Sequence, residues 1–290
     1  MHKLAGAYSI NFLYSCPVAA EWSYNMERQQ FKLWENGTPL YNESYGQPET
    51  TVTWYPANVK EPRGCVIVFP GGGYGMRAEH EGKDIAEMLN KNGFHSFVLN
   101  YRVAPYKHPA PLEDAGRAVR FVRHYADKFG IHKNKIAVLG FSAGGHLAIT
   151  AAEQFDYGKS TGDEIDRESS RPDAAVFCYP VCTLLGEYTH KGSVKNLLGT
   201  DEPTDIAYKL SGELNAREDM PPCFIWHTFG DTGVPVQNSL MLADALRKKK
   251  IPVEMHLFPD GPHGLGLAEK YPHTAQWSPL LCNWLRHLQF

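Results

Sequence analysis

The residues with the clearest chemical potential form the run Gly140-Phe141-Ser142-Ala143-Gly144, a G-x-S-x-G pattern. An apolar run over 136–139 precedes it and an Ala- and Leu-rich segment over 143–152 follows, so the pattern joins a buried strand to a helix. A β-carbon at position 140 or 144 would crowd such a sharp turn. We predict that Ser142 is a nucleophile beside the positive end of the helix dipole. The alternative is a glycine-rich turn whose serine only caps the helix.

A serine hydroxyl needs an adjacent base, and partners of a G-x-S-x-G serine follow it as an acid and then a histidine. His263 lies in a loop just beyond the predicted strand 253–258. Of the other late histidines, His256 lies inside that strand, and His273 and His287 belong to the last helical region. We therefore predict that His263 is the base; the alternative is an ordinary turn histidine in water.

Asp231 lies four residues beyond the predicted strand 223–227 and is the predicted acid. Asp244 falls in the middle of a predicted helix, and Asp260 is too near His263 in the sequence to hold it from across a cleft. A carboxylate in this role keeps the imidazole in its working tautomer. The alternative is that Asp231 caps the predicted helix 235–249.

The glycine-rich run Pro70-Gly71-Gly72-Gly73-Tyr74 follows the predicted strand 65–69. This loop contains neither a Gly-Lys-Ser/Thr sequence nor a G-x-G-x-x-G order, which argues against phosphate binding by it. Consecutive glycines can present bare N–H groups to an oxyanion. We predict that the N–H groups of Gly72, Gly73 and Ala143 form an oxyanion hole. Tyr74 is expected to bind substrate, by stacking on a sugar or by narrowing the acyl pocket.

Apolar runs alternate with amphipathic segments, which predicts crossover units and a parallel sheet. Residues 50–55 are expected to form an edge strand, and residues 112–129 a single long helix ended by Gly130. We divide the chain into an N-terminal arm, residues 1–49, and a catalytic domain, residues 50–290. Residues 183–220 are polar and rich in turn residues, and are expected to form a cap-like insertion over the carboxyl edge of the sheet.

Charge and composition narrow the class of protein. The chain has 290 residues with 29 basic and 32 acidic side chains, and this balance indicates neither a nucleic-acid nor a membrane partner. No cluster has the ligand spacing of a zinc site, and we expect neither a metal nor a cofactor.

The cysteines form no C-x-x-C pair, which favours a reducing, cytoplasmic location; they are Cys16, Cys65, Cys178, Cys182, Cys223 and Cys282. Residues 4–20 make a poor signal-peptide core. The N-terminal arm, with one hairpin, is expected to pack on the main domain or on a second subunit, and a homodimer is one alternative.

The glycine loop, the G-x-S-x-G turn, the Asp231 loop and the His263 loop follow one another in this order along the chain. With this order, the chain resembles the α/β-hydrolase superfamily over residues 50–290. It looks closest to the esterase/lipase branch with a Gly-Gly-Gly oxyanion loop, and within it to bacterial acetyl-xylan-esterase-like and sugar-ester hydrolases. The resemblance implies a mostly parallel sheet with helices on both faces. Many relatives begin the oxyanion loop with a histidine that braces it, and this chain has Pro70 there. The motifs are Pro70–Tyr74, Asn100–Pro105, Pro109–Asp114, Gly140–His146 and His263–Gly266.

Together, the residues and the resemblance predict a metal-free serine carboxylesterase acting on short O-acyl esters, in particular O-acetyl groups on sugars. An arylformamidase or other amide hydrolase on the same triad is one alternative, and a catalytically silent binding protein is another. His146 is expected to pack or to form hydrogen bonds, and Asp114 to lie at the start of a helix, where the dipole stabilises a carboxylate. Neither is assigned a catalytic role.

Overall fold

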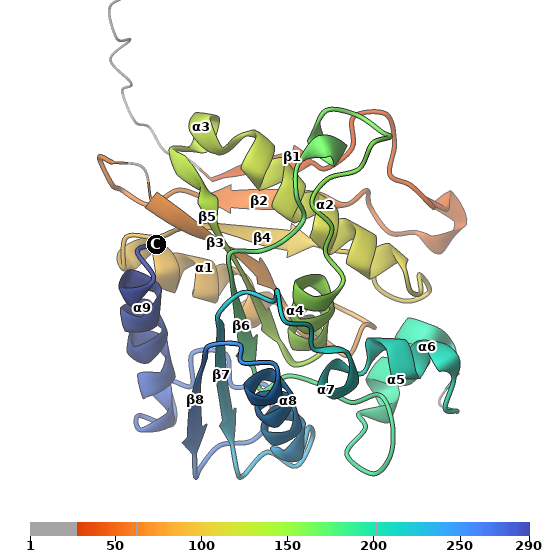
Figure 1. Cartoon of the computed structure of the whole chain (residues 1–290), viewed down its shortest axis with the longest axis vertical. Coiled ribbons are helices and arrows are strands. Elements are labelled where there is room, and N and C mark those ends of the chain that lie inside the picture. The colour runs from red at the N-terminus through yellow and green to blue at the C-terminus, as the bar shows by residue number, and fades with distance from the viewer. Residues whose placement is uncertain (1–27, 62, 201) are drawn as a thin grey trace, which may run out of the picture.

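The structure, a computed structural model, describes residues 28–61, 63–200 and 202–290 (Figure 1). In this part of the chain one sheet of eight strands has the order β1-β2-β4-β3-β5-β6-β7-β8. All neighbours from β4 to β8 are parallel, whereas β1 with β2 and β2 with β4 are antiparallel. The strands are β1 (Gln29–Lys32), β2 (Thr51–Tyr55), β3 (Arg63–Phe69), β4 (His95–Asn100), β5 (Ile131–Phe141), β6 (Ala174–Cys178), β7 (Cys223–Thr228) and β8 (Val253–Phe258).

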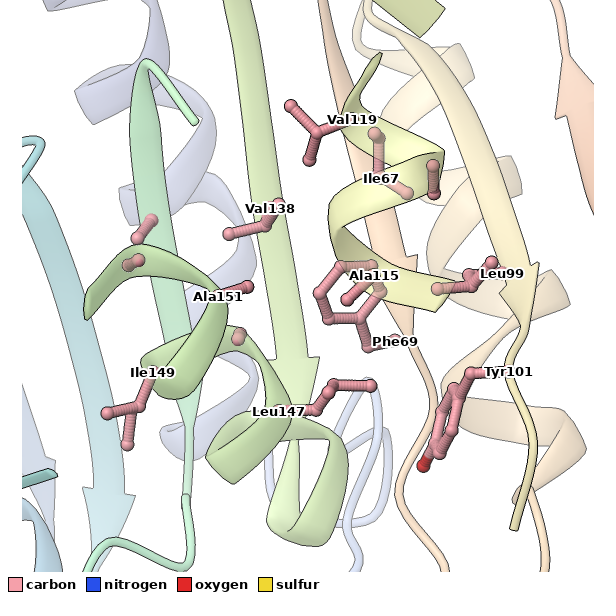
Figure 2. Close-up of a cluster of buried hydrophobic side chains, with 14 of the residues drawn as sticks. Ile67, Phe69, Leu99, Tyr101, Ala115, Val119, Val138, Leu147, Ile149 and Ala151 are labelled. Carbon is pink, nitrogen blue, oxygen red and sulfur yellow. The ribbon is translucent and has the colours of Figure 1, made fainter. Parts of the chain in front are cut away.

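Helices cover both faces of the sheet, because alternate residues of the central strands are apolar on both sides. On β5, Val138 belongs to one buried cluster and Leu139 to the other. Figure 2 shows the first cluster, in which Val138 and Ile67 lie near side chains of α2 and α4. The helices are α1 (Lys83–Lys91), α2 (Ala110–His124), α3 (Ala126–Phe129), α4 (Ser142–Glu153), α5 (Lys191–Leu198), α6 (Asp205–Leu210), α7 (Gly212–Asn215), α8 (Gln237–Lys248) and α9 (Trp277–His287).

The residues of the two buried clusters show which face of the sheet each helix covers. Helices α2, α3, α4 and α8 contribute buried residues to the first cluster, and α1 and α9 contribute to the second. In Figure 1, α1 and α9 accordingly lie on the side of the sheet away from α2, α4 and α8. The predicted α/β-hydrolase architecture, with a mostly parallel sheet between two helical layers, is confirmed.

Two predictions about elements are wrong. Strand β2 is not at the edge, because β1 pairs with it and forms the edge itself; Gln29–Lys32 of the predicted N-terminal arm therefore add one strand to the sheet. The long helix also breaks at Tyr125, between α2 and α3, although Gly130 ends it in the left-handed conformation as predicted. The apolar spacing runs through Tyr125 and gave no sign of the break.

The predicted insertion, residues 183–220, contains the short helices α5, α6 and α7. It contacts the loop after β3, where the Asn196 side chain donates a hydrogen bond of 2.8 Å to the carbonyl of Gly73. The strand ends that carry the predicted chemistry therefore meet this insertion.

Other sequence predictions concern the cysteines, the N-terminal segment, metal ligands and membrane spans. Cys16 and residues 4–20 lie outside the described residues. The five described cysteines are all free and buried. Among residues 28–61, 63–200 and 202–290, no group of three or more His, Cys, Asp or Glu side chains could hold a metal ion. In the same ranges, no helix combines the length and the apolar character that a membrane span requires.

Candidate active site

The nucleophile turn follows the predicted path: β5 ends at Phe141 and α4 begins at Ser142. Ser142 has a φ of +53°, in the left-handed region that residues with a β-carbon rarely adopt. A β-carbon on Gly140 would lie 1.9 Å from the carbonyl oxygen of Gly144, and one on Gly144 would lie 2.2 Å from that of Phe69. Glycine is therefore required on both sides of the serine.

The structure brings the three predicted catalytic residues into hydrogen-bonding contact. His263 Nε2 lies 2.7 Å from Ser142 Oγ, and His263 Nδ1 lies 2.7 Å from Asp231 Oδ2. The side chain of Asp231 is buried, whereas that of His263 is 25% exposed and can reach a bound substrate. A serine, a base and an orienting carboxylate in this order can carry out nucleophilic acyl transfer.

Asp231 is held by more partners than the sequence indicates. Its Oδ1 accepts hydrogen bonds from the backbone N–H groups of Gly233 and Val234, each at 2.9 Å. Burial alone would raise the pKa of Asp231, but the hydrogen bonds from His227 and His263 outweigh it and lower the pKa well below its usual value. Asp231 is therefore ionised at neutral pH. It does not cap the next helix, whose N-cap is Val236.

His227, which sequence reasoning missed, is a second imidazole on Asp231. It is buried near the end of β7, and its Nε2 lies 3.2 Å from Asp231 Oδ2 and 2.9 Å from the carbonyl of Val234. Both of these are acceptors, so Nε2 carries the proton and Nδ1 accepts the hydroxyl of Ser239 at 2.7 Å. The histidines weighed as the base all lie beyond the predicted strand 223–227, whereas His227 is the last residue of that strand.

The glycine loop is shaped to expose N–H groups. Gly72 and Gly73 have φ values of +123° and +63°, and neither N–H donates to any residue in the described part of the chain. The N–H of Ala143 is in the first turn of α4, where no carbonyl one turn earlier in the helix can accept it. Within the described residues these N–H groups of Gly72, Gly73 and Ala143 are unpaired, which an oxyanion hole requires.

The prediction that Tyr74 stacks on a sugar is wrong. Its side chain is 1% exposed, and its hydroxyl lies 2.8 Å from His146 Nδ1, so the ring is not available to stack on a sugar. His146 is fully buried, and its Nε2 donates to the carbonyl of Leu210 at 2.8 Å. As predicted, His146 forms structural hydrogen bonds; with Tyr74 it ties the glycine loop to the insertion. The loop sequence does not reveal which way a side chain next to it points.

Glu81, also missed, takes the bracing position that Pro70 cannot fill. Its buried carboxylate accepts the N–H of Gly71 at 2.8 Å and the hydroxyl of Tyr179 at 2.6 Å. The Tyr179 hydroxyl accepts the N–H of Gly266 at 2.8 Å, and its ring packs edge-on against His263 with 5.1 Å between centroids. We call Glu81 and Tyr179 the carboxylate–tyrosine brace, because they join the glycine loop to the histidine loop.

Asp114 differs from its prediction in position and partner. It is the fifth residue of α2 rather than its start, and it is fully buried. Its carboxylate accepts the backbone N–H of Arg102 at 2.8 Å and pairs with the Arg102 guanidinium at 2.6 Å. Asp114 therefore fixes the chain just after β4 through an ion pair, and the helix dipole is not its main partner.

A cavity of about 470 Å³ opens beside His263. Its volume is in the range of small-molecule sites. Leucines contribute to its wall, but polar and charged side chains from two loops line much of it; they are His80, Asp84, Glu269, Lys270 and Tyr271.

This chain is similar in sequence and in fold to several known proteins. Residues 53–246 match the model of the BD-FAE family. An acetyl ester-xyloside bifunctional hydrolase from Caldicellulosiruptor lactoaceticus is 45% identical, with a TM-score of 0.86 over 90% of this chain and 96% of that one. Endo-1,4-beta-xylanase B of Butyrivibrio fibrisolvens is 40% identical over 84% of this chain, and an acetylxylan esterase of Xylanibacter ruminicola is 31% identical over 79%. The chain spans 39% and 47% of the lengths of these two relatives.

Proposed function

Since this chain belongs to the BD-FAE family of α/β-hydrolases, we propose that it is a serine carboxylesterase. Its substrates are short-chain O-acyl esters, in particular O-acetyl esters of carbohydrates. The observation that carries the proposal is the contact of Ser142 with His263 and of His263 with Asp231, each at 2.7 Å. Three free N–H groups beside the serine support it.

In this mechanism, His263 Nε2 takes the proton of Ser142 Oγ as that oxygen attacks the acyl carbon. The carbonyl oxygen becomes an oxyanion, held by the N–H groups of Gly72, Gly73 and Ala143. Its collapse breaks the ester bond, and the alcohol leaves with the proton that His263 returns. Water, activated by His263 in the same way, then releases the acid and regenerates the serine. Asp231 stabilises the imidazolium in both steps.

Two observations support a carbohydrate alcohol. The cavity beside His263 is lined in part by polar and charged side chains, which can form hydrogen bonds with a hydroxylated leaving group. Two of the relatives carry xylan or acetylxylan in their names, and a similar solved structure is an acetyl ester-xyloside hydrolase.

The deciding experiment compares kcat/KM for acetylated xylo-oligosaccharide, phenyl acetate and N-formylkynurenine. The proposal expects hydrolysis of both acetates, with the oligosaccharide the better substrate. A dominant rate on N-formylkynurenine would move the protein to the arylformamidases. No turnover of any of the three by folded protein would favour the catalytically silent alternative.

A further inference from the structure

His190 lies at the N-terminus of α5, in the insertion, and the reaction described above does not use it. Its Nδ1 accepts the backbone N–H of Ser193 at 3.3 Å and lies 2.8 Å from the Ser193 hydroxyl. Because a backbone N–H can only donate, Nδ1 must be unprotonated in the neutral ring, and the proton is on Nε2. The cap of α5 thus fixes the tautomer of His190.

The ring of His190 lies at the active site. Its Cε1 would be 3.6 Å from a β-carbon placed on Gly73, one of the proposed oxyanion donors. Burial and the charge of His263 lower the pKa of His190, while Asp231 opposes this shift. The imidazole is therefore neutral when His263 works, and it is only half-buried. No hydrogen bond joins its Nε2 to any residue in the described ranges.

A short acyl ester offers few acceptors to the Nε2–H group of His190. The carbonyl oxygen is held by the oxyanion donors, and the ester oxygen receives the proton of His263. An acetyl methyl group has no acceptor, so every remaining acceptor on the substrate belongs to the alcohol.

We propose that His190 is a substrate-binding residue that donates its Nε2–H to a hydroxyl of the alcohol moiety and so selects hydroxylated alcohols. This inference rests on the proposed function, because it assumes an ester whose acyl group is short. It also gives the insertion a role, because α5 holds this donor close to Gly73 of the glycine loop.

The test uses two substitutions that separate the helix cap from the donor. Asn is a good N-cap residue, so His190→Asn keeps the contact with Ser193 but does not reach the position of Nε2. His190→Gln retains an N–H donor at about that reach and weakens the cap. The matched control is His132→Ala, which removes an exposed histidine of β5.

The readout is the ratio of kcat/KM for glycerol 1-acetate to that for propyl acetate, two esters that differ in the hydroxyls of the alcohol. We expect His190→Asn to lower this ratio by roughly three- to tenfold, the range of one neutral hydrogen bond, mainly through KM. His190→Gln should retain most of the ratio, and His132→Ala all of it. An unchanged ratio in His190→Asn, or an equal loss in both His190 variants, would overturn the inference.

Acetylated xylobiose, assayed in parallel, separates this inference from the proposed function. If the wild-type protein does not hydrolyse it, the carbohydrate substrate is wrong, while the glycerol and propyl esters still report on His190. If the wild type hydrolyses it and His190→Asn leaves the glycerol-to-propyl ratio unchanged, the proposed function stands and the role of His190 fails.

Discussion

At Ser142, backbone strain and reactivity occur in the same residue. A left-handed conformation at a non-glycine residue costs on the order of 1–3 kcal/mol, and the surrounding structure must hold it. The close approach of Gly140 to Gly144, and of Gly144 to β3, does this from both sides. The Ser142 side chain contributes only its hydroxyl, which forms a hydrogen bond with His263.

Replacing Ser142 with Ala should therefore abolish ester hydrolysis and leave the fold unchanged. Alanine has the same β-carbon and keeps the same strained φ, so the thermal midpoint should stay close to that of the wild type. Loss of a triad nucleophile costs several powers of ten in kcat. Turnover of phenyl acetate and the unfolding temperature are the two measurements; a variant with a few per cent of wild-type activity or more would exclude Ser142 as the nucleophile.

Asp231→Asn should lower kcat by roughly a thousandfold or more and change KM little. The amide can donate to Nδ1 of His263 and so stabilise the wrong tautomer. Asp260→Asn is the control, since within the described residues its carboxylate forms no hydrogen bond or ion pair with His263. Near-wild-type turnover in Asp231→Asn would assign the orienting role to another acid.

The triad could be predicted from the sequence because chain order and loop position leave few candidates. Ser142, Asp231 and His263 each follow a strand that is visible as an apolar run. The direction of a side chain leaves no such trace, and for that reason Tyr74 was placed in the substrate site. His227 was missed because a histidine inside a strand has the same appearance whether it faces a core or an active-site carboxylate.

At the scale of elements, the two catalytic loops are held together by the carboxylate–tyrosine brace rather than by a histidine at the start of the glycine loop. Glu81 and Tyr179 are 98 residues apart in sequence, so no local pattern could pair them. Strand β1 was missed for a related reason. Its four residues, Gln-Gln-Phe-Lys, are mostly exposed and lack the apolar run that identifies the central strands.

Glu81→Gln should lower kcat by roughly ten- to a hundredfold with a smaller change in KM. A glutamine has one acceptor oxygen, so its amide N–H₂ must face either the N–H of Gly71 or the hydroxyl of Tyr179. A shifted Gly71 would move the oxyanion donors next to it, and losing one donor outright costs about 100- to 1000-fold. Glu79→Gln, two residues away and exposed, is the control. Equal kcat in the two variants would show that the brace does not position the glycine loop.

At the scale of the whole molecule, the fold buries histidines that must remain neutral. His95 and His146 are buried, and burial lowers the pKa of each to about 4. In the unfolded chain they titrate near 6.5. Between pH 4 and pH 6.5 the unfolded state binds more protons than the folded state, so acid favours unfolding. The free energy of unfolding is therefore unaffected by these two rings above pH 6.5 and falls as the pH falls toward 4.

We therefore expect the free energy of unfolding to decrease from pH 6.5 to pH 4, by at most about 3 kcal/mol for each of these two histidines. Urea denaturation at pH 7, 5.5 and 4.5 measures it. His95→Asn removes one titrating ring but can keep the acceptor for the N–H of Ala57, so its stability should depend less steeply on pH. His132→Ala, at an exposed position, should keep the wild-type slope. An identical slope in all three proteins would mean that the buried rings do not control acid stability.

The last prediction, a preference for short acyl chains, follows from where the insertion places its apolar residues. Leu184, Leu197 and Leu210 are buried in the core of the domain, whereas Ile206 and Leu214 face solvent. No sustained apolar stripe is left to line a channel for a long chain. Each methylene buried in a matching pocket is worth about 0.8 kcal/mol, so an enzyme with such a channel would gain steeply with chain length.

This protein should show the reverse order: acetyl or propionyl esters best, with activity falling beyond butyryl. The measurement is kcat/KM for the acetyl, butyryl and octanoyl esters of one leaving group. Leu214→Ser is a useful control, because it makes the insertion less apolar at an exposed position and should leave the order unchanged. If the octanoyl ester were the best substrate, this prediction would be wrong. Leu197 and Leu210, buried here, would then have to move to line an apolar channel beneath the insertion.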